Sequence, residues 1–142
     1  MESPFCRILS RVLKRCGSAA QELRIVIADD SGIIREHLQR AISRTKGLKL
    51  VGAAENGVEA LSLVQELNPD VAILDISMPH KNGLEVLKEI RRNDSSTVII
   101  MFTGETSELL KNTCLEQGAN HFFCKSDITA MLEKCQDLLL RS

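Results

Sequence analysis

Five polar side chains follow four of the short apolar runs in this 142-residue chain, each at the point where a run ends. They comprise three carboxylates, a hydroxyl and an ammonium: Asp29, Asp30, Asp75, Thr103 and Lys125. Three carboxylates in one pocket raise the pKa of at least one of them unless a cation compensates. Magnesium suits such a set, because it takes few carboxylates, keeps waters and accepts phosphate oxygens. A carboxylate nucleophile beside a metal and an ammonium is suited to phosphoryl transfer.

Each acid taken singly has an ordinary explanation, since an Asp at a strand end is most often a turn or capping residue. The joint placement after separate runs is what indicates a site. His80 falls in the loop after the third run and could lie near that site. His37 lies within a helical pattern and His121 opens a strand, so we expect both to be structural or exposed.

The apolar runs predict the strands that position these groups. Most are continuously apolar, which is typical of parallel strands buried on both faces. They cover residues 25–28, 50–54, 71–74, 98–102 and 121–124. The segments between them repeat apolar residues at helical spacing. Ser31 is suited to cap the first helix, Gly47 follows it, and Asn68 ends the second.

Five strand–helix units in about 120 residues predict an open parallel sheet with helices on both faces. The simplest match is an α/β, flavodoxin-like (βα)5 three-layer sandwich with a five-stranded parallel sheet of order 2-1-3-4-5. In that order the ends of the first, third, fourth and fifth strands are neighbours, so the five polar side chains should converge. No glycine-rich nucleotide-binding loop follows the first run.

The chain divides into an N-terminal extension, residues 1–22, and a domain at 23–142. The extension could form a basic amphipathic helix followed by a short linker at residues 17–20, and residues 1–15 could then contact a partner or an anionic membrane. The alternative is a frayed or domain-packed extension. The last helix reaches the C-terminus, so we expect a stand-alone domain.

Composition excludes several classes of protein. The formal net charge of −1 and the absence of Trp and Tyr argue against direct DNA binding and against a base-stacking surface. The apolar fraction of 44% allows a sizeable core. Five cysteines without a Cys-x-x-Cys pair favour buried thiols and a reducing cytoplasm over disulfides or a zinc site.

The combined motifs resemble the receiver domain of two-component response regulators, particularly the single-domain chemotaxis type. The matching pieces are residues 25–31, 73–79, 82–83, 101–104 and 122–125. The resemblance implies that Asp75 accepts a phosphoryl group from a sensor histidine kinase or a histidine phosphotransfer protein. It further implies that Asp30, Asp75 and the backbone carbonyl of Ser77 bind Mg²⁺ directly, with Asp29 acting largely through water.

The same resemblance implies a switch. Thr103 would hydrogen-bond the phosphoryl group, Lys125 would pair with it, and Gly104 would leave space for the donor. Movement of Thr103 would let Phe122 turn inward and change the surface of the fourth helix, fifth strand and fifth helix of the repeat. The alternative for Phe122 is a plain core residue.

The sequence departs from the family pattern at Ser126, where many receivers have proline, so the geometry of the Lys125–Ser126 peptide is open. Ser77 and Glu105 occupy positions that tune the phosphoryl lifetime in this family.

Three functions remain in view: a phosphorylation-controlled signalling module without other enzyme activity, an interaction domain that no longer accepts phosphate, and a magnesium phosphatase. Phosphatases with an aspartyl nucleophile usually carry a second acid where Ser77 stands. A phosphorylated stand-alone domain would act on an unidentified target protein or relay its phosphate.

Overall fold

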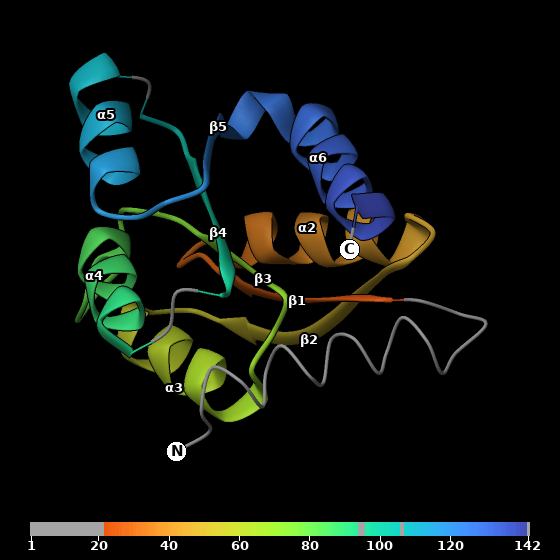
Figure 1. Cartoon of the computed structure of the whole chain (residues 1–142), viewed down its shortest axis with the longest axis horizontal. Coiled ribbons are helices and arrows are strands. Elements are labelled where there is room, and N and C mark those ends of the chain that lie inside the picture. The colour runs from red at the N-terminus through yellow and green to blue at the C-terminus, as the bar shows by residue number, and fades with distance from the viewer. Residues whose placement is uncertain (1–21, 94–95, 106, 142) are drawn as a thin grey trace.

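The computed structural model describes residues 22–93, 96–105 and 107–141, and five strands alternate with five helices along them (Figure 1). The strands are β1 (Leu23–Ala28), β2 (Leu48–Ala54), β3 (Val71–Leu74), β4 (Val98–Thr103) and β5 (His121–Cys124). The helices are α2 (Gly32–Arg44), α3 (Gly57–Leu67), α4 (Gly83–Asn93), α5 (Glu108–Glu116) and α6 (Ile128–Arg141), with a short 3₁₀ turn, η1 (Lys125–Asp127), before α6.

The strands form one parallel sheet of order β2-β1-β3-β4-β5, which confirms the predicted fold class. β1 and β2 begin two residues earlier than the apolar runs indicated, because Leu23 pairs with Leu48 and both are buried. Val51 is an extra residue in the β1–β2 register: Ile25 pairs with Leu50 and Val26 with Gly52. This bulge lies on an edge strand, where bulges are common.

Two separate hydrophobic clusters cover the two faces of the sheet. Helices α2 and α6 lie on one face and α3, α4 and α5 on the other (Figure 1). Successive strand residues alternate between them: Ile25 and Ile27 pack toward α2 and α6, whereas Val26 and Ala28 pack toward α3 and α4. Burial on both faces explains why the strand sequences are continuously apolar.

Side-chain caps begin α2 and α3 close to the carboxyl ends of β1 and β2. The Ser31 hydroxyl accepts a hydrogen bond from the Ile34 N–H at 3.4 Å, as predicted, and Asn56 caps α3 in the same way. α3 ends at Asn68, whose φ of 48° places it in the left-handed region. The predicted helix end at this residue is confirmed.

Cys114 and Cys135 are buried as expected, whereas Cys124 is half-buried; all three are free thiols. The Lys125–Ser126 peptide is trans, like every other peptide bond in the described residues. The predicted amphipathic segment at residues 1–15 lies outside the described residues. Within residues 22–141, apart from the gaps at 94–95 and 106, no helix is long and apolar enough to cross a bilayer.

Candidate functional site

The five side chains predicted to form a site lie at or just after the ends of four strands, at the carboxyl edge of the sheet. Asp29 and Asp30 follow β1 directly, Asp75 follows β3, and Thr103 is the last residue of β4. Lys125 opens η1 immediately after β5. Because the strand order makes these ends neighbours, the structure brings together all five residues that the sequence singled out.

The three carboxylates form a compact acidic cluster. One carboxylate oxygen each from Asp29, Asp30 and Asp75 lie within 4.8 Å of one another. Asp29 is 1% exposed and Asp75 is 4% exposed, whereas Asp30 faces solvent. Two buried carboxylates so close together require compensating positive charge.

Lys125 supplies part of that charge by bridging the two buried acids. Its Nζ lies 2.7 Å from Oδ2 of Asp29 and donates a hydrogen bond of 3.1 Å to Oδ2 of Asp75. Partial burial alone would lower the pKa of Lys125, but its contacts with the two carboxylates outweigh this and raise the pKa. The ammonium is therefore firmly charged within the cluster.

Asp75 keeps a raised pKa despite this partner. Burial is the largest cause and the negative charge of Asp29 is the second, while contacts with Lys125 and Thr103 act in the opposite direction. One ammonium therefore does not fully compensate the carboxylates. A further cation at the cluster would favour the ionised form of Asp75.

The donor set fits a hard divalent cation. Asp29 Oδ1 accepts a hydrogen bond of 2.9 Å from the Ser31 N–H. Asp29 Oδ2 is buried and lies 2.7 Å from the Lys125 ammonium, which it shares with Asp75 Oδ2. Two buried carboxylates that share one ammonium retain uncompensated negative charge. Carboxylate oxygens of this kind are the ligands that Mg²⁺ prefers.

Thr103 and the loop after β3 border the Asp75 carboxylate. Thr103 is buried, and its Oγ1 accepts a hydrogen bond of 3.4 Å from the Glu105 N–H. The exposed Ser77 hydroxyl donates to a Glu105 carboxylate oxygen at 3.5 Å. This contact connects the loop that follows Asp75 to the loop that follows β4. His80 lies in the first of these loops and is exposed, with a φ of 69°.

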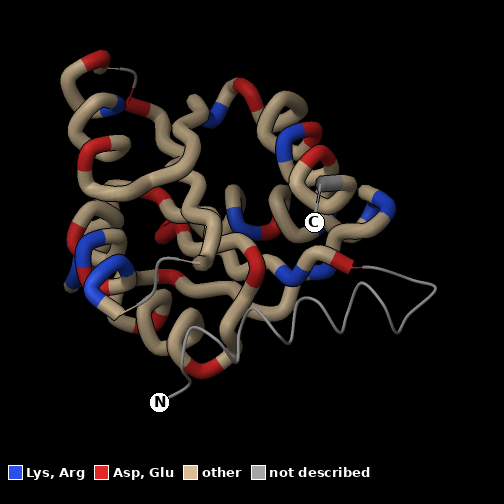
Figure 2. Tube along the Cα trace, in the orientation of Figure 1, with Lys and Arg blue, Asp and Glu red and all other residues tan. Residues whose placement is uncertain are grey.

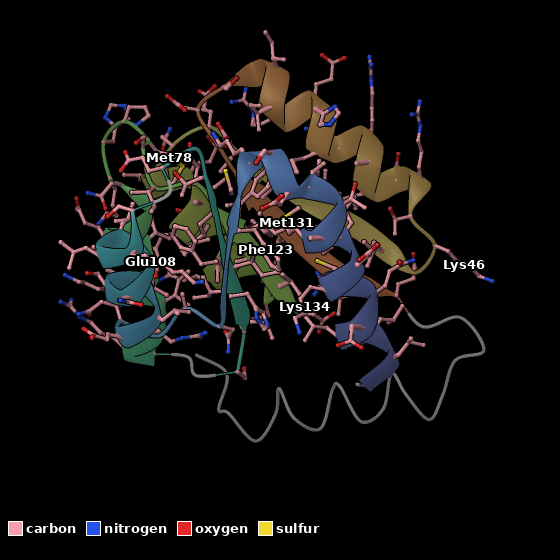
Figure 3. The ribbon with its side chains drawn as sticks, turned by 90° about the horizontal axis from the view of Figure 1, so that it is seen from above. Lys46, Met78, Glu108, Phe123, Met131 and Lys134 are labelled. Atoms are coloured by element: carbon pink, nitrogen blue, oxygen red, sulfur yellow. The ribbon has the colours of Figure 1, made fainter. Side chains whose placement is uncertain are left out.

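Adjacent aromatic residues on β5 face opposite layers. Phe122 is half-buried and packs against the α3–α4–α5 cluster, in register with Met101. Phe123 packs with the α2–α6 cluster, and Figure 3 shows it in the same region as Met131 of α6. Phe122 is thus the aromatic residue of β5 that adjoins α5.

Two structural supports of the site escaped the sequence interpretation. A Cβ on Gly57 would lie 2.6 Å from the carbonyl carbon of Lys81, so the start of α3 presses directly on the loop after Asp75. Arg35 of α2 donates a hydrogen bond of 2.7 Å to the Asp29 carbonyl oxygen. An arginine five residues after an acid pair was a weak signal at most, and Gly57 gave none, because its close contact is with a segment distant in sequence.

Charges of both signs occur on both helical layers of the described chain (Figure 2). α4 ends with Arg91 and Arg92 but carries Glu85 in its first turn, and Lys134 of α6 lies 3.9 Å from Asp137. Basic residues therefore do not stand alone on either layer of the described chain.

Comparisons with known proteins agree on one family. The family model described as the response regulator receiver domain matches residues 25–136. A protein-glutamate methylesterase/protein-glutamine glutaminase of Treponema denticola is 32% identical over 128 residues, which cover 84% of this chain and 34% of that protein. The chain therefore spans about a third of this relative.

Solved structures give the same result. The response regulator domain of Thermotoga maritima CheB has a TM-score of 0.77 at 32% identity, covering 82% of this chain and 96% of that one. A CheX-CheY-BeF3-Mg²⁺ complex from Borrelia burgdorferi has a TM-score of 0.77 at 27% identity, covering 83% and 90%.

Proposed function

This chain belongs to the response regulator receiver family, and we propose that it accepts a phosphoryl group on Asp75 from a histidine kinase or a histidine phosphotransfer protein. The observation that carries the proposal is the buried Asp75 carboxylate, held by Lys125 inside a cluster of three acids. A carboxylate oxygen of Asp75 attacks phosphorus, the phosphorus–nitrogen bond breaks, and its electron pair returns to the histidine of the donor.

Mg²⁺ is the proposed cofactor, with Asp30, Asp75 and the Ser77 carbonyl as direct ligands and Asp29 acting largely through water. When bound, the ion neutralises charge on the phosphoryl oxygens. Asp29 and Asp30 orient it from the end of β1, and Lys125 pairs with the phosphoryl group after transfer. Support for this arrangement comes from Asp29 and Asp75, two buried carboxylates that share one ammonium, and from the short distances among the three carboxylates.

Signal output would follow from Thr103 and Phe122. Thr103 hydrogen-bonds the phosphoryl group and moves toward it, and the space it leaves lets the half-buried Phe122 turn inward. The surface of α5, β5 and α6 then changes and binds a target protein, or the phosphate passes to another histidine. The packing of Phe122 on the α5 side of the sheet supports this route.

The 23–142 domain with its 1–22 extension is proposed to act as a stand-alone cytoplasmic module whose only chemistry is its own phosphorylation and dephosphorylation. A receiver attached to a further catalytic domain is the second candidate, because the Treponema denticola relative named as a methylesterase is about three times the length of the matched segment. The third candidate is an interaction domain that no longer accepts phosphate. The experiment below distinguishes it from the first candidate, because it measures phosphoryl acceptance directly.

Intact mass after incubation with acetyl phosphate tests the proposal, with and without Mg²⁺. We expect one added phosphoryl group that requires Mg²⁺ and is absent from Asp75→Asn. Asp137→Asn, which alters a carboxylate on α6, serves as the matched control and should be phosphorylated normally. A folded wild-type protein that gains no phosphoryl group and also binds no beryllofluoride would refute phosphoryl acceptance.

A further inference from the structure

The turn that carries the two metal-binding acids after β1 is fixed on both sides of Asp29. The Asp29 N–H donates to the Ala54 carbonyl of β2 at 3.1 Å. The Asp29 carbonyl accepts 2.7 Å from the guanidinium of Arg35, which is a full helical turn into α2. The peptide group between Asp29 and Asp30 therefore has its orientation set by a side chain that contacts neither carboxylate.

Arg35 is itself held in place by neighbouring groups. Its side chain is 22% exposed, and its second terminal nitrogen lies 3.9 Å from a carboxylate oxygen of Glu55, the residue that follows β2. A Cβ on Gly32 would lie 3.6 Å from that nitrogen, at ordinary van der Waals distance. The guanidinium thus spans from the end of β2 to the end of β1.

We propose that Arg35 is a positioning residue for the magnesium site: it fixes the Asp29–Asp30 peptide and so aims the exposed Asp30 carboxylate at the ion. Asp29 keeps its direction through Ser31 and Lys125, but Asp30 is exposed and depends on the peptide plane from which it extends. This inference rests on the proposed magnesium function. Partners that orient metal ligands typically affect metal affinity by about 10-fold or more when lost.

The direction of the change in Mg²⁺ affinity on removing Arg35 distinguishes a positioning role from a purely electrostatic one. A guanidinium beside an acidic cluster repels a divalent cation, so its removal by charge alone would tighten Mg²⁺ binding. Loss of positioning would weaken Mg²⁺ binding. A purely structural role would lower the melting temperature and leave the affinity unchanged.

Isothermal titration of Mg²⁺ into the full chain tests the proposal with three variants. Arg35→Gln removes both the charge and the reach of the donor, and we expect Mg²⁺ binding about 10-fold weaker. Arg35→Lys keeps the charge and one long donor, and should regain part of the affinity. Arg40→Gln removes an arginine of the same helix that pairs with Glu36 at the surface, and should bind Mg²⁺ like wild type.

Unchanged or tighter binding by Arg35→Gln would overturn the proposal, and so would an Arg35→Lys variant as weak as Arg35→Gln. Arg35→Met, which keeps an unbranched stem, replaces Arg35→Gln under the same criteria if the latter does not fold. Failure of wild type to bind Mg²⁺ would instead refute the magnesium site itself, so the two failures are distinguishable.

Discussion

The contact between the start of α3 and the loop after Asp75 (residues 76–82) allows a prediction with an internal control. Gly32 and Gly57 are each the first residue of a helix, so replacing either with alanine changes helix propensity and unfolded-chain entropy similarly. The surroundings differ. The new Cβ meets Arg35 at 3.6 Å in the first case. In the second case it meets the carbonyl oxygen of Lys81 first, and then the carbonyl carbon and Cβ of that residue at 2.6 and 2.8 Å.

Carbon atoms pack at about 3.5–4.0 Å and the carbonyl oxygen lies nearer still, so Gly57→Ala must displace α3 or the loop after Asp75 by more than about 1 Å. The obstruction includes backbone, which does not rotate away as a side chain would. Overpacking of this kind costs about 1–3 kcal/mol. We therefore expect Gly57→Ala to unfold with a free energy about 1–3 kcal/mol below that of Gly32→Ala.

Urea unfolding followed by far-ultraviolet circular dichroism measures this difference, since the chain lacks Trp and Tyr. The displaced loop contains Ser77, so phosphorylation of Asp75 by acetyl phosphate should slow in Gly57→Ala and proceed normally in Gly32→Ala. Equal stability of the two variants would show that the loop yields freely, and the reasoning would be wrong.

Three further predictions follow from other contacts. Mg²⁺ at ten times its dissociation constant should raise the free energy of unfolding by about 1.4 kcal/mol, which calorimetry can measure. Asp30→Asn should show a smaller gain in the free energy of unfolding at the same Mg²⁺ concentration. An equal gain would show that Asp30 is not part of the magnesium site. Burial, with the charge of Lys134, lowers the pKa of His121 in the folded chain, so its contribution to stability is complete above about pH 6.5 and declines as the pH falls. Urea unfolding from pH 7 to 5 should therefore show a smaller loss of stability in His121→Phe than in wild type, and identical losses would contradict this. Arg91 donates to the Gly118 carbonyl at 2.8 Å, so Arg91→Ala should lose about 1–3 kcal/mol in the same assay and Arg91→Lys less; full stability of Arg91→Ala would count against that contact.

The fold could be predicted because its signals are local. Each strand is a run of apolar residues, and each helix is an amphipathic stripe between two runs. The parallel arrangement then places the carboxyl ends of all strands at one edge, which was enough to group Asp75 with Lys125 across 50 residues of sequence. The predicted strand ends were less accurate. Leu23 and Leu48 join the sheet because they pair with each other, and neither sequence segment by itself indicates that pairing.

The supports of the site could not be predicted for a corresponding reason. The contact of Gly57 with Lys81 depends on where α3 lies over the loop after β3, and no feature near either residue encodes that distance. In the sequence, Arg35 is one basic residue on an exposed helix. Its hydrogen bond to the Asp29 carbonyl oxygen is evident only from the structure. The carboxylates were predictable from residue type, whereas the groups that orient them emerge only from tertiary packing.

The separation of the core into two layers has an evolutionary consequence. Among the described residues the two hydrophobic clusters have no member in common, so we expect a change of side-chain volume in one layer to be compensated within that layer. Among relatives, we expect the size of residue 27 or 73 to covary with that of 38 or 131, which share its cluster. The neighbouring positions 26 and 72 should vary independently of these and follow α3 and α4 instead. Mutational drift beneath α2 and α6 can thus proceed without disturbing the layer beneath α5.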